Sequence, residues 1–180
     1  MINSHIALVW TAGGGRYAVP LAAVVEVVRP VWVTPVPEAP EHMLGMIRFR
    51  HAVVPVFDLR ARFGPATPGF LYMNRFLIVR IGDRSIALVV DEVIDLVEFG
   101  EADVHGRDAF TETTLPPMVS AVLTLESRLV ALLDLSSVVT ASDLQSVDAA
   151  IQALHASADE RRALPPVLDP VHDRADGGRP

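Results

Sequence analysis

Short hydrophobic runs rich in Val, Ile and Leu alternate with turn-forming residues over most of the chain. Runs this short, bounded by Gly, Pro or charged residues, predict strands rather than helices. The glycines at 13–15 connect the first two runs, which we expect to form a β-hairpin. The pattern predicts a mainly β chain, with strands at 6–10, 16–20, 24–28, 46–49, 52–57, 76–79, 86–90, 93–97 and 129–133.

The stretch 45–63 combines more signals of secondary structure, one after another, than any other part of the chain. It leads from Gly45 through an apolar strand to a corner at Arg50 and His51, and then into a second strand at 52–57. Pro55 cannot donate a hydrogen bond to a neighbouring strand, so we expect this strand to run along an edge or to bulge there. Asp58 follows as the expected N-cap of a short helical turn at 59–63.

The pattern of strands repeats within the chain. An offset of 69 residues aligns Gly13 with Gly82, together with the strands on either side of them. Further on, an offset of 76 residues aligns Asp58 with Asp134 and the strands that precede them. Two copies of one unit imply two small all-β lobes, each too small to bury its own apolar face, that pack on each other. The alternative is chance similarity between Val-rich strands.

The C-terminal region has a different pattern. Ser142 or Asp143 can cap a helix at 141–164, whose apolar residues recur at alternating spacings of three and four: Leu144, Val147, Ile151, Leu154 and Ala158. This stripe could dock on the protein's own strands or form a seam with a partner helix. The Pro-, Gly- and Asp-rich segment 165–180 is expected to be disordered.

Composition and charge exclude several classes of function. The chain has 180 residues, of which 51% are hydrophobic, and a net charge of −7. Nucleic acid is not an expected partner, because phosphate binding requires a clustered positive field. Without Cys there are no disulfides or thiolate sites, and no apolar run reaches the roughly 18 residues of a membrane span. We therefore expect a soluble, unexported protein without direct membrane insertion.

A search for catalytic or ligand-binding patterns finds almost none. The six His residues lack metal-ligand spacing, and the chain contains no Lys for a phosphate-binding loop. Gly13, Gly15 and Ala18 match a dinucleotide fingerprint, but Pro20 denies the helix that this fingerprint requires. Adjacent acids Asp91 and Glu92 could form a carboxylate dyad, although most such pairs are simply exposed. We expect no catalytic residue, cofactor or metal.

Several segments in order resemble the CheW-like family of chemotaxis coupling domains over roughly 6–139. The central stretch carries a Gly, an apolar pair, an Arg at a corner, a Val-Val-Pro-Val strand and an Asp-Leu-Arg ending. The resemblance continues at 17–20, 24–27, 35–40, 87–93 and 128–135. So many ordered segments are far more specific than any single motif.

The resemblance implies a fold that is mainly β, with two intertwined SH3-like five-stranded β-barrel lobes packed together, short helices and a C-terminal helix. It places a CheW-like domain at 1–140. One lobe would comprise about 14–74, and the other 5–13 plus 75–140. The helix at 141–164 and the tail at 165–180 would follow this domain.

The same resemblance implies a non-enzymatic adaptor that couples methyl-accepting receptors to a CheA-type histidine kinase in a signalling array. Its partners would be the regulatory domain of the kinase and the cytoplasmic tips of chemoreceptors. It would be cytoplasmic and recruited peripherally to membrane receptor arrays. The alternative is a divergent CheW-like scaffold that has lost or exchanged one partner and acts in another receptor-coupled pathway.

Six residues match the family's receptor- and kinase-contacting motifs: Val24, Glu26, Gly45, Arg50, Val93 and Leu96. Val24 and Val93 occupy equivalent places in the two repeats and could instead belong to the core. Glu26 and Arg50 are charged within apolar runs, which favours an interface role. A structural Arg50 would instead pair with an internal acid such as Asp58.

This sequence departs from the family pattern at the hairpin corner. Residues 48–51 read Arg-Phe-Arg-His where the family usually has Asn-Leu-Arg-Gly, and Ala87 replaces a usual Gly. His adopts a positive φ less readily than Gly.

Overall fold

The computed structural model describes residues 5–37, 39–58, 60, 74–110 and 115–163. Eleven strands occupy most of this length: β1 (His5–Ala12), β2 (Gly15–Pro20), β3 (Val24–Val28), β4 (Met43–Phe49), β5 (Ala52–Phe57), β6 (Arg75–Ile81), β7 (Arg84–Val90), β8 (Glu92–Phe99), β9 (Val104–Gly106), β10 (Val119–Leu125) and β11 (Arg128–Leu133). The helices are short 3₁₀ turns at Leu21–Ala23, Glu101–Asp103 and Arg107–Ala109, then α2 (Leu135–Val138) and α3 (Ala141–Ala163). The expected mainly β fold is confirmed.

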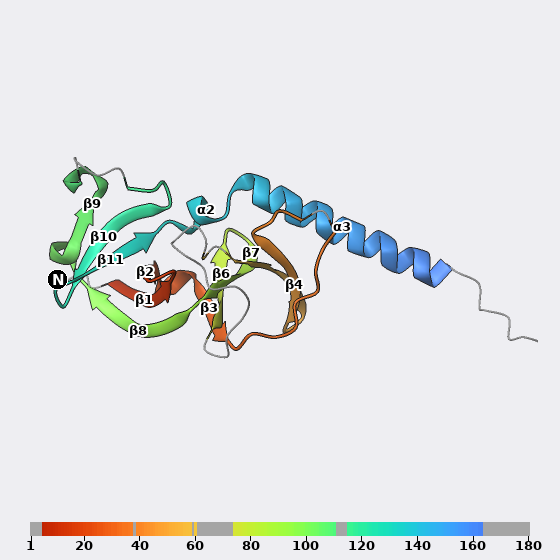
Figure 1. The fold of residues 1–180 in the computed structure, drawn as a ribbon, viewed down its shortest axis with the longest axis horizontal. Helices are drawn as coiled ribbons and strands as arrows, with labels where there is room; N and C mark the ends of the chain where they lie inside the picture. Colours follow the sequence, from red (N-terminus) through yellow and green to blue (C-terminus); the bar gives the residue numbers. More distant parts are fainter. Residues whose placement is uncertain (1–4, 38, 59, 61–73, 111–114, 164–180) are drawn as a thin grey trace, which may run out of the picture.

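The strands form two sheets that lie side by side (Figure 1). We call the six-stranded sheet, with the order β8-β1-β2-β11-β10-β9, lobe A. The five-stranded sheet, with the order β3-β6-β7-β5-β4, is lobe B. In each lobe one central pair is parallel, β2 with β11 and β5 with β7, and all other pairs are antiparallel.

The internal repeat is confirmed, because β1, β2 and β3 recur as β6, β7 and β8, and β4 and β5 recur as β10 and β11. The third strand of each unit joins the hairpin of the other unit: β3 pairs with β6, and β8 pairs with β1. Each lobe therefore contains strands from both halves of the chain.

This exchange corrects the expected lobe boundaries of 14–74 and of 5–13 plus 75–140. Strand β2 stays in lobe A, while β6 and β7 belong to lobe B. The reason is the tight turn at Gly13 and Gly14, both with positive φ, which keeps β2 hydrogen-bonded to β1. The chain changes lobes only after Pro20, and again after β7.

Hydrophobic side chains fill both lobes and the space between them. Ala7, Val9, Ala18, Phe99, Leu123 and Val130 form the core of lobe A, and Ile47, Val54, Val56, Phe76, Ile78, Ala87 and Val89 form that of lobe B. A larger shared core draws residues such as Trp10 from lobe A and Leu77 from lobe B. Since each lobe alone encloses few large side chains, the shared core supplies much of the burial that stabilises the fold.

Strands β4 and β5 form the hairpin expected from the central stretch. Strand β5 is not an edge strand, however, since it lies between β4 and β7. Its parallel pairing with β7 involves only Val56 and Phe57, so Pro55 precedes the region where β7 requires a donor. Asp58 accepts a hydrogen bond from the backbone N–H of Arg60 at 3.1 Å, as an N-cap does. Most of the helical turn expected at 59–63 lies outside the described residues.

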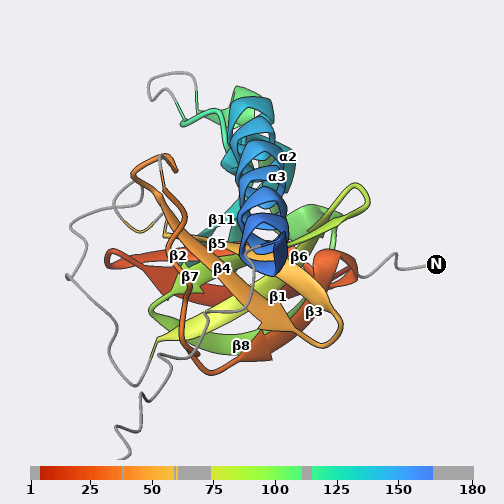
Figure 2. The same ribbon diagram turned by 90° about the vertical axis from the view of Figure 1, so that its right-hand side faces the viewer.

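Helix α3 confirms the expected C-terminal helix and docks on lobe B (Figures 1 and 2). Val147 and Ala150 are buried in the shared core, where Leu144 and Ile151 pack beside them. The N-cap is Thr140 rather than Ser142 or Asp143: its Oγ1 accepts from the backbone of Asp143, whose carboxylate accepts from Thr140 in return. The side chains of Leu154 and Ala158 and the tail at 165–180 lie outside the described residues.

Asp143 also binds His42, whose Nε2 lies 2.6 Å from its Oδ1. Burial raises the pKa of Asp143, but hydrogen bonds from Thr140 and His42 outweigh it, and the net pKa is lowered. A lowered folded-state pKa means that this carboxylate stabilises the fold above its unfolded pKa of about 3.9, and that this stability is lost as the pH falls through the folded value.

Asp143→Ala is accordingly expected to reduce the free energy of unfolding by about 1–2 kcal/mol, because the helix loses its capping box and His42 loses its partner. Urea denaturation at neutral pH measures this change. Asp148→Ala is the matched control, since Asp148 makes an exposed, solvent-screened ion pair with Arg84 and should cost much less than Asp143→Ala. Equal losses for the two variants would contradict the prediction.

None of the helices in the described ranges is both long and apolar enough to cross a membrane.

Candidate partner-binding site

Glu26 and Arg50, two of the predicted contact residues, form an ion pair on the surface of lobe B. Arg50 donates from Nη2 to Oε2 of Glu26 at 2.7 Å. Their side chains are 65% and 41% exposed for Arg50 and Glu26 respectively, so both charges remain accessible to a partner. The alternative partner for Arg50, Asp58, instead binds Arg60.

The ion pair joins the two edges of the sheet in lobe B. Glu26 lies on β3, one edge strand, and Arg50 lies in the turn that connects β5 to β4, the other edge strand. Sheet curvature therefore brings together two residues that belong to opposite ends of the strand order. The pair bridges the mouth of the barrel at this point.

The turn fixes the position of Arg50. Arg50 has a φ of 54°, in the left-handed region, whereas His51 is not among the residues with positive φ. A non-glycine residue pays about 1–2 kcal/mol for this conformation. The guanidinium lies 5.0 Å from the centre of the Phe49 ring, a cation–π contact that helps to orient it. The backbone of the turn and the Phe49 ring thus hold the Arg50 side chain in a defined position on the surface.

Gly45 is buried and therefore offers no surface to a partner. Its φ is +138°, and a Cβ on it would lie 2.1 Å from the carbonyl oxygen of Thr34. This close approach permits two backbone hydrogen bonds of 2.8 Å between Thr34 and Met46. The structure therefore indicates that Gly45 allows the segment before β4 to pack closely against this strand. Any effect of Gly45 on a partner is then indirect.

Val24 and Val93 are equivalent in the two repeats, and both are partly buried against the shared core. Val24 pairs with Val79 across to β6, and Val93 pairs with Trp10 across to β1. These contacts favour the core interpretation for most of each side chain. Leu96, in contrast, is 51% exposed on the edge strand β8. It remains a predicted partner contact.

A buried polar cluster around Arg60 was not predicted from the sequence. Arg60 is 2% exposed and binds both carboxylate oxygens of Asp58, at 2.9 and 2.7 Å. Its Nη1 also lies 3.4 Å from Asn74 and from Asp91. The hydrogen bonds with Asp58 outweigh burial and raise the pKa of Arg60. Asp91 further accepts from the backbone N–H of Gly13 in lobe A, so the cluster connects the two lobes.

This cluster also resolves the two roles considered for Asp91 and Glu92. Asp91 is a structural acid within the cluster, while Glu92 is exposed at the start of β8. The only signal in the sequence was the position of Asp58 and Asp91 directly after apolar strands. Among the described residues, no group of three or more potential metal ligands comes together.

Comparison with known proteins agrees with this architecture. The family model for the CheW-like domain matches residues 7–143. The chain is 28% identical over 131 residues to the chemotaxis protein CheW of Rhizobium meliloti, covering 73% of this chain and 84% of that protein. It is 32% identical over 114 residues to protein FrzA of Myxococcus xanthus, covering 57% and 67%.

A solved structure has the same fold. The crystal structure of the scaffolding protein TtCheW from Thermoanaerobacter tengcongensis superposes with a TM-score of 0.70 and 26% sequence identity, covering 79% of this chain and 96% of that one. Its match extends the resemblance from sequence segments to the arrangement of both lobes. The chain belongs to the CheW-like family, whose members are non-enzymatic scaffold proteins of chemotaxis.

Proposed function

We propose that this protein couples methyl-accepting chemoreceptors to a CheA-type histidine kinase in a signalling array. It would act in the cytoplasm and reach the membrane through the receptors. The kinase's regulatory domain and the receptor tips are its proposed partners, and Val24, Glu26, Arg50, Val93 and Leu96 are the proposed contact region. Membership of the CheW-like family supports the adaptor role.

The observation that supports this site best is the exposed pair between Glu26 and Arg50. An exposed ion pair contributes only about 0–1 kcal/mol to folding. The turn nevertheless holds Arg50 in a strained left-handed conformation over Phe49. A guanidinium held in this way is a preformed donor for a carboxylate of a partner, to which it can make forked, charge-assisted hydrogen bonds.

Arg50→Glu is expected to weaken binding to the receptor tip or to the kinase's regulatory domain at least about tenfold, or about 1.4 kcal/mol. The free energy of unfolding should fall by no more than about 1 kcal/mol, since the lost pair is exposed. Calorimetric titration with each partner and urea denaturation on the same preparation measure both quantities. Arg80→Glu, which makes the same charge change at an exposed position on β6 of lobe B, is the charge-matched control.

The double variant Glu26→Arg with Arg50→Glu separates pairing from recognition. It restores an ion pair with the charges exchanged, so it should recover stability but not binding. Recovery of binding would indicate that the partner requires an ion pair across the barrel mouth, whichever of the two positions carries the positive charge. Unchanged binding of Arg50→Glu to both partners would contradict the proposed site.

A further inference from the structure

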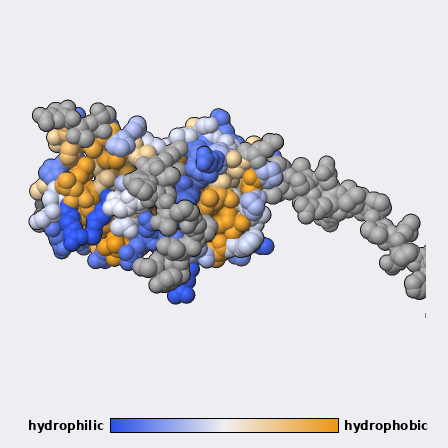
Figure 3. Space-filling model, in the orientation of Figure 1, coloured by the Kyte–Doolittle hydropathy of each residue, from blue (hydrophilic) through white to orange (hydrophobic). Residues whose placement is uncertain are grey.

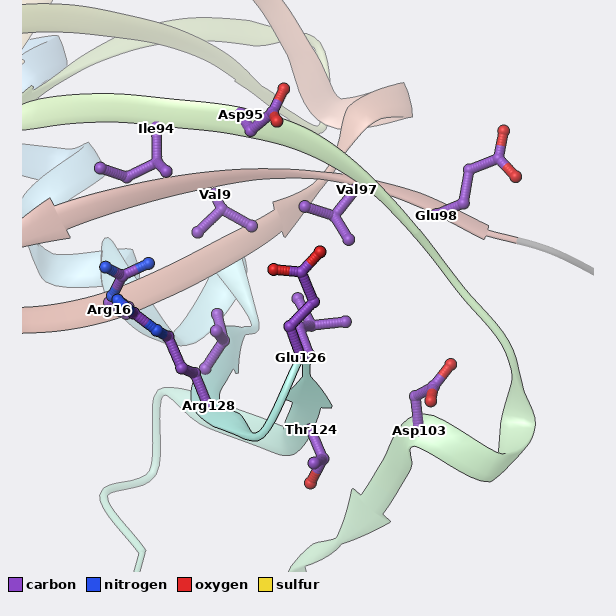
Figure 4. A pocket seen from close by; sticks show the side chains of 12 residues that line it. Val9, Arg16, Ile94, Asp95, Val97, Glu98, Asp103, Thr124, Glu126 and Arg128 are labelled. Atoms are coloured by element: carbon purple, nitrogen blue, oxygen red, sulfur yellow. The ribbon is translucent and has the colours of Figure 1, made fainter.

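Lobe A has a cleft at its barrel mouth of about 410 Å³. Its lining includes the apolar residues Val9, Val97 and Val130 and the acidic residues Asp95, Glu98 and Glu126. Figure 4 shows the side chain of Glu126 rising from the turn between β10 and β11 towards β8. Hydrophobic and hydrophilic residues also alternate on this end of the molecule in Figure 3. The cleft thus combines apolar with charged lining residues.

The internal repeat shows what occupies the corresponding place in lobe B. The offset of 69 residues relates Glu26 to Asp95, and the offset of 76 relates Arg50 to Glu126. The backbone agrees, because Glu126 has a φ of 47° where Arg50 has 54°. The turn and the edge strand are therefore alike in the two lobes. The charge of the turn residue is opposite.

This reversal leaves the mouth of lobe A without the bridge that closes lobe B. In lobe B the Arg50 guanidinium sits on the Glu26 carboxylate. In lobe A, Asp95 and Glu126 carry the same charge and cannot pair. Asp95 accepts the backbone N–H of Leu96 through Oδ1. Within the part of the chain that the structure describes, Asp95, Glu98 and Glu126 make no ion pair.

Two arginines, Arg16 and Arg128, also line the cleft. Figure 4 shows them on the side of Glu126 that lies away from Glu98 and Asp103. Neither makes an ion pair within the described ranges. The cleft therefore has an acidic side along β8 that its own arginines do not neutralise.

We propose that this cleft binds an arginine side chain presented by a partner protein. The guanidinium would take the place beside Asp95 and Glu126 that Arg50 takes beside Glu26 in lobe B. The aliphatic stem of arginine would cover the apolar residues Val9, Val97 and Val130. Arginine fits better than lysine, since an arginine closes the corresponding mouth of lobe B and its planar guanidinium makes forked contacts with a carboxylate. This site lies on β8 of lobe A, the strand that carries the proposed contacts Val93 and Leu96, and is separate from the Glu26 and Arg50 pair of lobe B.

The test uses N-acetyl-argininamide as the probe and the full chain labelled with ¹⁵N. We expect saturable amide shifts at 95–98 and 126–130 in NMR spectra, with millimolar affinity, as suits so small a ligand. N-acetyl-citrullinamide has nearly the same shape without the charge and is the matched control. Its shifts at these amides should be much smaller. The proposal is overturned if no saturable shift occurs there, or if the two probes give equal shifts.

Glu126→Arg adds a sharper criterion, because it gives lobe A the residue that closes lobe B. This variant should keep or raise the melting temperature and lower probe affinity at least about tenfold. If it fails to fold, the isosteric pair Asp95→Asn and Glu126→Gln must lower affinity instead. Retained affinity in these variants would refute the site. Shifts at the same amides on dilution of the protein alone would assign the cleft to a second copy of this chain, and overturn the assignment to another protein.

Discussion

Arg60→Ala is expected to lower the free energy of unfolding by about 3–5 kcal/mol, the largest single effect we predict. Removing one partner of a buried ion pair leaves the other charge uncompensated. Here Asp58 loses two donors, Nε and Nη2 of one side chain, while Asn74 and Asp91 lose their contact with Nη1. Urea denaturation at neutral pH, with the slope checked for two-state behaviour, measures the change.

Two further variants show how much of this loss comes from the forked contact with Asp58 and how much from removing any arginine in this region. Arg60→Lys keeps the charge but cannot make the forked contact with Asp58, so it should lie between the parent and Arg60→Ala. Arg75→Ala is a comparison on the neighbouring strand, since Arg75 donates to the backbone carbonyl of Asn74 and is only partly buried. If Arg60→Ala cost less than about 1 kcal/mol, the cluster could not be a main connection between the lobes.

Gly45→Ala is expected to cost at least about 2 kcal/mol. The new Cβ would collide with the Thr34 carbonyl, and a φ of +138° is strained for any residue with a side chain. The two hydrogen bonds between Thr34 and Met46 would have to lengthen or break. Thermal or urea denaturation measures the loss.

Gly82→Ala is the matched control for this prediction. Gly82 also has a positive φ, of 58°, but its Cβ would meet nothing within 4 Å. It should show only the conformational cost of about 1–2 kcal/mol. If Gly45→Ala abolished partner binding at unchanged stability, Gly45 would be a direct contact after all, contrary to its buried position.

The sequence predicted the strands and their repetition because short Val-rich runs between turn residues have few other interpretations. It could not predict which sheet each strand joins, since nothing in the sequence indicates whether the chain changes lobes before β2 or after it. The cap of α3 was misplaced for a related reason. Thr140, Ser142 and Asp143 are all good capping residues, and only the packing of Asp143 on His42 selects Thr140.

The candidate site shows the same limit. The proximity of Glu26 to Arg50 depends on the curvature of a sheet whose strand order the sequence does not reveal. Family resemblance named both residues, but it also named Gly45, which acts within the fold. Arg60 was missed because arginine is usually exposed, and its burial depends on polar partners from three separate places along the chain, Asp58, Asn74 and Asp91.

The exchange of β3 and β8 has a consequence for how such a fold could originate. A chain carrying only one repeat would own a hairpin and a third strand that reaches away from it, so it could not complete a sheet by itself. Two such chains would complete each other's sheets, which is the arrangement of a domain-swapped dimer. The present chain has the geometry of that dimer with its two subunits fused end to end. Fusion allows the halves to diverge, as the opposite charges at Arg50 and Glu126 illustrate.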